Sequence, residues 1–183
     1  MNRFILAEGL RDSARYMCDQ HVRKMIVEEA QMLSTVVRAA YPELVDAFPE
    51  LYASCYERHP CTVWAGLNQG NWRVAYGLWL SMSAEYLERF GGLHGTYKKL
   101  AAPLACVEQT TGFSRLPRVG RTPHPQCFGD HTHLKTNETW PVRAYRMYYV
   151  VKEATFKRPM TWTRTPRPAW LDDPDYHQLP HVA

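Results

Sequence analysis

The chain has 183 residues, and its hydrophobic fraction of 45% is enough to bury the core of one domain without disulfides. Its apolar runs are far shorter than the ~20 residues that cross a bilayer, and its five cysteines include no CxxC pair. A formal net charge of +4 is too small to indicate nucleic acid by itself. We therefore expect one cytoplasmic, monomeric domain over residues 1–183, with no membrane segment and no cofactor.

The first half of the chain is patterned for helices. From Asp19 to Ala40, apolar residues recur at steps of three and four until Pro42 interrupts the pattern. A short helix is expected over residues 43–55, and a long one should begin at Pro60 and end before residue 91. Three glycines lie inside that long stretch: Gly66, Gly70 and Gly77. They predict either a break near residues 66–71 or a close backbone approach there.

Residues 101–137 lose this periodicity and gather prolines and glycines, so we expect a long loop there. A last helix is predicted from a cap at Thr139, with Pro141 in its first turn, to about Lys157. Beyond Trp170 the chain should be extended. These elements predict an all-α fold, a single compact helical domain with a long Pro/Gly-rich loop and an extended C-terminal segment.

One face of the 19–40 helix carries polar residues at steps of three and four. They are His21, Lys24, Glu28, Gln31 and Thr35. Such a face can hold a general acid/base whose charge also stabilises a cation in a transition state. The alternative is a solvated face on which a Lys24 to Glu28 ion pair contributes only ~0.3–0.5 kcal/mol.

The segment CDQHVRKMIVEEAQML resembles the active-site helix of phage-type pyrimidine-dimer DNA glycosylases and their bacterial relatives, in which a glutamate follows an aspartate by nine positions. That glutamate is Glu28 here. The N-terminal MNRFIL, with Arg3, the segments HPCTVW and AEYLERFG, and the later FKRPMTW are also similar to parts of this family. The resemblance implies extrusion of a nucleotide from DNA and cleavage of its N-glycosidic bond.

In that family the nucleophile is an N-terminal amine, which the resemblance places at Met1 or Asn2 of this chain. An α-amino group titrates well below lysine and so is partly neutral at working pH. Glu28 would be the acid/base, Arg3 and His21 would line the pocket, and Asp19 would hold the helix entry. Because Asn2 is large, Met1 should be retained, and a mechanism in which Glu28 orients water stays open.

Basic and aromatic residues gather between Trp140 and Trp170, with seven basic side chains against one acid. The arginines of the predicted loop, at three-residue spacing, also favour an anion, although a solvated loop explains them equally well. The predicted DNA contacts are Arg3, Arg23, Lys24, Asn71, Arg115, Arg118, Arg121, Arg143, Arg146, Lys157, Arg158 and Trp162. The stretch HPQCFGDHTH matches no zinc spacing, so no metal is expected.

The sequence thus predicts a DNA glycosylase that acts on a damaged or modified pyrimidine in double-stranded DNA. If the N-terminal amine is the nucleophile, the enzyme would also have lyase activity. Repair and attack on modified phage DNA are both open roles, and the protein would associate with the nucleoid when bound to DNA. Two alternatives remain: an enzyme that modifies bases in phage DNA without excising them, and a DNA-binding protein without catalysis.

Overall fold

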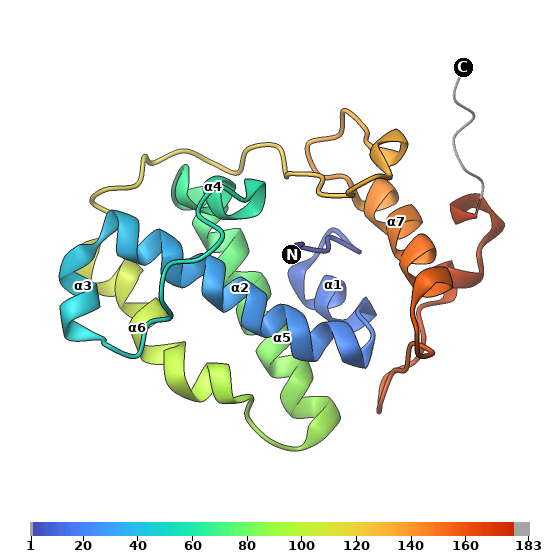
Figure 1. The fold of residues 1–183 in the computed structure, drawn as a ribbon, viewed down its shortest axis with the longest axis horizontal. Coiled ribbons are helices and arrows are strands. Elements are labelled where there is room, and N and C mark those ends of the chain that lie inside the picture. Colours follow the sequence, from blue (N-terminus) through green and yellow to red (C-terminus); the bar gives the residue numbers. More distant parts are fainter. Residues whose placement is uncertain (1, 178–183) are drawn as a thin grey trace.

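The computed structural model describes residues 2–177, and within them it contains helices and no strand. Two long helices, α2 (Asp19–Ala40) and α5 (Gln69–Phe90), cross at the centre of Figure 1. The shorter α-helices are α1 (Leu10–Tyr16), α3 (Pro42–Ala47), α4 (Pro60–Gly66), α6 (Gly95–Thr111) and α7 (Val142–Thr155). The 3-10 turns are η1 (Thr132–Leu134), η2 (Ala169–Asp172) and η3 (Pro174–Tyr176). The fold is all-α, as the periodicity predicts.

Helix α2 spans the residues that its apolar pattern predicts. Its stripe packs on α5, α4, α6 and α3, and Ile26 and Leu33 are fully buried. The helix ends because Pro42, two residues beyond Ala40, cannot donate a backbone hydrogen bond and opens α3 instead. These helices cover the apolar side of α2, whereas on the opposite face His21 and Thr35 are buried by other segments and Lys24 is exposed.

The predicted long helix from Pro60 is two helices, and both expectations for its glycines are met. After Gly66 the chain breaks, and Asn68 caps α5 by accepting a hydrogen bond from the Asn71 amide at 2.9 Å. A Cβ on Gly70 would lie 2.5 Å from the carbonyl carbon of Gly120, so only glycine admits this close approach. The loop that follows α6 also accepts from the amides of Gln69 and Gly70, which satisfies the first turn of α5.

The prediction of a loop from residue 101 is wrong at its start, because α6 continues through Pro103 to Thr111. Proline inside a helix costs ~3 kcal/mol and usually ends it. Here Leu100, Leu104 and Val107 recur at helical spacing and are essentially fully buried, so tertiary packing outweighs that cost. The irregular segment covers residues 112–141, apart from η1, and runs along the upper edge of Figure 1 from α6 to α7.

Two other helix boundaries differ from the prediction. Helix α3 ends at Ala47, because Pro49 follows it, and does not reach residue 55. Helix α7 begins after Pro141 and ends at Thr155, and it has no side-chain cap because its N-cap residue is Pro141, not Thr139. Among residues 2–177, no helix has the length and apolarity that a membrane span requires.

The N-terminal segment, residues 2–7, is buried and contacts both α2 and α7. Its Phe4 ring lies 4.7 Å from the ring of His21 on α2 and 5.3 Å from that of Tyr149 on α7. Helix α7 thus packs on this segment and on the C-terminal turns η2 and η3 (Figure 1). The start of the chain, the first turns of α2 and helix α7 consequently meet in one place.

Candidate active site

A pocket of about 120 Å³ lies where the N-terminal segment, α2 and α7 meet. Its lining residues are Asn2, Phe4, His21, Lys24, Met25, Glu28, Tyr148 and Lys152. The volume is comparable to the ~150 Å³ cavity that admits a benzene ring in a protein core. The pocket therefore has room for a small planar group, and three of its side chains carry ionisable charge.

Glu28 stands in this pocket with a carboxylate that is nearly withdrawn from solvent. Its side chain is 12% exposed, whereas that of Lys24, whose Nζ lies 3.2 Å from Oε1, is 67% exposed. Lys152 of α7 lines the same pocket. A carboxylate that lines a pocket and pairs with a lysine can accept a proton or stabilise a cation, while the exposed Lys24 remains accessible to an anion.

His21 is buried at the back of the pocket and is held by α7. Its Nδ1 lies 2.7 Å from the Tyr149 hydroxyl, which already accepts a hydrogen bond from the Cys18 amide, also at 2.7 Å. The Tyr149 hydroxyl has one donor and two acceptor positions, so it can share this hydrogen bond with either tautomer of the neutral imidazole. Burial, with smaller effects of Lys152 and Lys24, lowers the pKa of His21 to about 3. His21 is thus a neutral positioning group and not an imidazolium acid.

Asn2 lines the pocket together with Glu28, although 26 residues separate them in the chain. Its side-chain amide donates to the Cys127 carbonyl at 2.8 Å, and its Oδ1 accepts from the Arg3 amide at 2.8 Å. These bonds fix the start of the described chain against the wall of the pocket. Met1, the other candidate for the amine, lies outside the described residues.

Arg3 does not line the pocket and does not reach the surface, so it cannot contact DNA. Its guanidinium is 1% exposed and binds the neighbouring glutamate, Glu29, with Nε 2.9 Å from Oε2. A further bond runs from Nη1 to the Cys61 carbonyl at 3.3 Å. The prediction for Arg3 is corrected because the adjacent carboxylates of α2 point to different sides, Glu28 into the pocket and Glu29 into the core.

Three further predicted DNA contacts are engaged inside the protein. Asn71 is fully buried and donates to the Trp64 carbonyl and the Thr122 hydroxyl. Arg146 donates to the Leu6 carbonyl at 2.9 Å. The indole N–H of Trp162 donates to the Tyr16 carbonyl at 3.1 Å, as expected of a side chain that secures the C-terminal segment. The fully buried Asn71 cannot contact DNA, whereas Arg146 and Trp162 are half-buried and use these hydrogen bonds to hold the chain.

The loop arginines diverge from one another. Arg115 donates to the Ala40 carbonyl at the far end of α2, and Arg121 stacks 4.0 Å from the ring centre of Trp140. Arg118 is exposed, as are Arg23, which lies over the Phe90 ring, and Arg143. The three-residue spacing of Arg115, Arg118 and Arg121 does not place them on one face, because residues 114–122 are not helical. None of these three arginines lines the pocket that contains Glu28.

A second hollow of about 400 Å³ adjoins the first through Lys152. It is lined by Gln20, Lys152, Thr155, Phe156, Lys157 and Arg158, and the Phe156 ring lies 5.0 Å from that of His21. Lys157 and Arg158 are exposed. We name the four cations around the two hollows the basic rim: Lys24, Lys152, Lys157 and Arg158.

A larger hollow, about 590 Å³, lies elsewhere, between the C-terminal half of α2, α4 and the start of the 112–141 segment. Its two arginines already donate to backbone carbonyls: Arg38 to Leu51 and Tyr52, and Arg115 to Ala40. It therefore offers less available chemistry than the smaller pocket, and size alone does not identify the site.

Asp19 connects the entry of α2 to the C-terminal segment. Its carboxylate accepts hydrogen bonds from Arg89, Thr161 and Thr163 at 2.8–3.0 Å. Burial opposes the charged form, yet the bonds from Thr163 and the other donors lower the pKa of Asp19 below its ordinary value. The carboxylate thus holds the helix entry, and it anchors the segment that carries Lys157 and Arg158.

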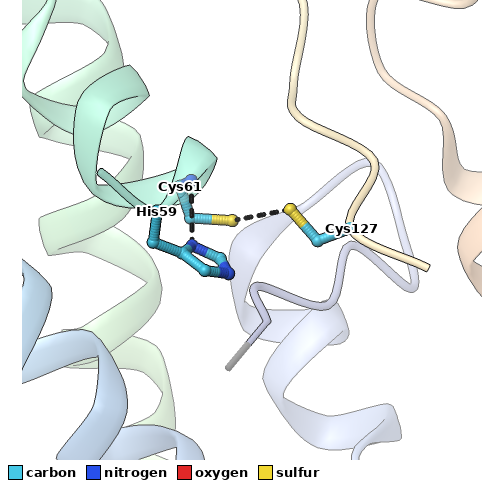
Figure 2. Close-up of side chains that lie close together, drawn as sticks. All are labelled: His59, Cys61 and Cys127. Atoms are coloured by element: carbon cyan, nitrogen blue, oxygen red, sulfur yellow. Dashed lines mark hydrogen bonds between the residues drawn. The ribbon is translucent and has the colours of Figure 1, made fainter. Parts of the chain in front are cut away.

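Sequence reasoning did not anticipate a cluster of three metal-ligand side chains near Asn2. His59, Cys61 and Cys127 have ligand atoms that all lie within 4.8 Å of one another. Figure 2 shows how the three side chains approach each other. His59 caps α4 and Cys61 is in its first turn, whereas Cys127 belongs to the 112–141 segment. The spacing of 66 residues between the cysteines carries no signal that a motif search can find.

Comparisons of the chain with protein-family models, curated proteins and solved structures found no match.

Proposed function

We propose that this protein is a DNA glycosylase whose reaction centre is the pocket containing Glu28. The observation that carries the proposal is that Asn2 and Glu28 line one pocket. A carboxylate beside the start of the chain is the arrangement needed by the chemistry that the resemblance implies. The basic rim, in which Lys24, Lys157 and Arg158 are exposed, supports the proposal further, because DNA presents a line of phosphates to any protein that binds it.

In the proposed reaction, a nucleotide with a damaged or modified pyrimidine leaves the stack and its sugar enters beside Glu28. As the N-glycosidic bond breaks, positive charge develops on the sugar, and the carboxylate of Glu28 stabilises it. The nucleophile at C1′ is either the N-terminal amine, which forms an imine and leads to strand cleavage, or a water molecule oriented by Glu28. The neutral His21 supports the pocket wall without exchanging protons.

The proposal is tested with duplex DNA carrying ultraviolet dimers, uracil, or hydroxymethylated and glucosylated cytosine. We expect alkali-labile sites in one of these substrates, with release of a free base from all but the dimer, whose cleaved base stays linked to the neighbouring pyrimidine. Borohydride trapping then distinguishes the nucleophiles, because only an imine gives a covalent complex of protein and DNA. Absence of alkali-labile sites from every substrate, with DNA still bound, would instead identify a binding protein and refute the glycosylase.

Glu28→Gln keeps the size of the side chain and removes its charge. Acid/base catalysis by one side chain contributes roughly 10²–10⁴-fold, so excision should fall by at least about 100-fold. Glu88→Gln is the matched control, because Glu88 is exposed on α5 and pairs only with the exposed Arg11 at 3.5 Å. Full excision by the Glu28 variant would remove Glu28 from the mechanism.

A further inference from the structure

We propose that His59, Cys61 and Cys127 bind one Zn²⁺ ion and leave its fourth coordination position open. The basis is the side-chain cluster of Figure 2, in which one imidazole and two thiols converge from two segments distant in sequence. The proposal revises the expectation that the chain holds no metal. It goes beyond the proposed function and does not depend on it.

The distance between the sulfurs fits a shared metal. The two Sγ atoms lie 3.7 Å apart. Two thiolates bound at ~2.3 Å to one tetrahedral zinc would lie about 3.8 Å apart, whereas a disulfide brings its sulfurs to ~2.05 Å. The cysteines thus stand at the separation that zinc requires and do not have to move toward each other.

The imidazole needs a small adjustment. A ligand nitrogen of His59 lies within 4.8 Å of both sulfurs, and in a tetrahedral site it would lie roughly 3.6 Å from each. The Nδ1 lone pair now accepts a hydrogen bond from the Cys61 amide at 3.2 Å, which is long enough to be replaced by a metal bond. His59 is half-buried, so a side-chain rotation that moves its ligand nitrogen by about an ångström is sterically possible.

The charges of the proposed ligands suit a divalent cation. Metal binding would displace the protons of the Cys61 and Cys127 thiols, so that both bind as thiolates. Two thiolates neutralise a divalent ion, and the adjacent Arg3 is already balanced by Glu29.

The donor set suits zinc and excludes the hard cations. Two sulfurs and one nitrogen are too soft for Mg²⁺ or Ca²⁺, which prefer oxygen ligands. Within residues 2–177 no fourth His, Cys, Asp or Glu joins the cluster, so water or an external ligand would complete the tetrahedron. Such a site would join the start of α4 to the 112–141 segment, immediately beside Asn2, whose amide donates to the Cys127 carbonyl.

The test uses the full chain under reducing conditions, stripped with a chelator and then given Zn²⁺ alone. After desalting, elemental analysis should find one zinc per chain. With Co²⁺ in place of Zn²⁺, we expect a thiolate-to-cobalt charge-transfer band and the intense visible bands of tetrahedral coordination. Wild-type protein without bound zinc, or cobalt protein without the thiolate band, would overturn the proposal, as would a Cys61–Cys127 disulfide persisting in reductant.

Variants separate this site from adventitious binding. Cys127→Ser and His59→Asn should each weaken zinc binding by at least about 100-fold, since even residues that only orient a ligand contribute ~10–100-fold. Asparagine at position 59 preserves the cap of α4. Cys106→Ser is the matched control, because Cys106 is also half-buried but lies on α6 outside the cluster. Equal affinity of Cys127→Ser and Cys106→Ser would refute the assignment.

Discussion

Replacing Glu29 by glutamine removes the charge that the buried guanidinium of Arg3 faces and preserves the shape of the side chain. Arg3 and Glu29 are both almost fully buried, and two guanidinium nitrogens donate to the carboxylate. Removing one partner of a buried ion pair leaves an uncompensated charge and costs about 3–5 kcal/mol. The substitution Glu28→Gln instead removes the ion pair of Glu28 with the exposed Lys24, and an ion pair of this kind contributes only ~0–1 kcal/mol to stability.

Urea unfolding followed by circular dichroism measures this contrast. With a slope of roughly 2 kcal/mol per molar urea, Glu29→Gln should lower the unfolding midpoint by about 1.5–2.5 M, and Glu28→Gln by less than about 0.5 M. The rate of excision by the folded variants should show the opposite order, because Glu28→Gln should impair excision more than Glu29→Gln does.

A double variant provides the control. Arg3→Met with Glu29→Met replaces the pair by apolar side chains of similar length, and it should recover at least half of the stability that Glu29→Gln loses. If Glu29→Gln unfolds within about 1 kcal/mol of the wild type, the buried pair does not hold the N-terminal segment as argued.

Three further outcomes are expected. The pKa of His21 is about 3 in the folded protein and near 6.5 in the unfolded chain, so its contribution to stability is present above pH 6.5 and is lost as the pH falls. Between pH 7.5 and pH 5 the free energy of unfolding should therefore fall by about 2 kcal/mol on account of this residue. In urea unfolding, His21→Asn should lack this part of the pH dependence. Gly70→Ala should lower stability by ~1–3 kcal/mol in the same assay because its Cβ would meet the backbone of the 112–141 segment, whereas Gly95→Ala, with nothing within 4 Å, should not destabilise. Lys157→Ala or Arg158→Ala should weaken DNA binding in fluorescence anisotropy and reduce the salt slope by about 1, and an unchanged slope would place DNA elsewhere.

The periodic part of the fold was predictable because helix formation and burial follow local pattern. The apolar stripe of residues 19–40 and the stop at Pro42 predict α2 with its observed bounds. Helix α6 was missed because Pro103 and the nearby glycines dominated the local signal, while the burial that stabilises the helix comes from α2. Local propensity cannot weigh a contact made by a distant element.

The sequence also indicated that the polar face of α2 carries Glu28, since helical spacing determines which residues share a face. It could not show that Glu29 points inward to Arg3, nor that His59 and Cys61 meet Cys127. Those facts depend on how the N-terminal segment and the 112–141 segment pack against α2 and α4. Helical periodicity extends over a few residues, whereas Arg3 and Glu29 are 26 residues apart and Cys61 and Cys127 are 66 apart, so tertiary packing alone brings them together.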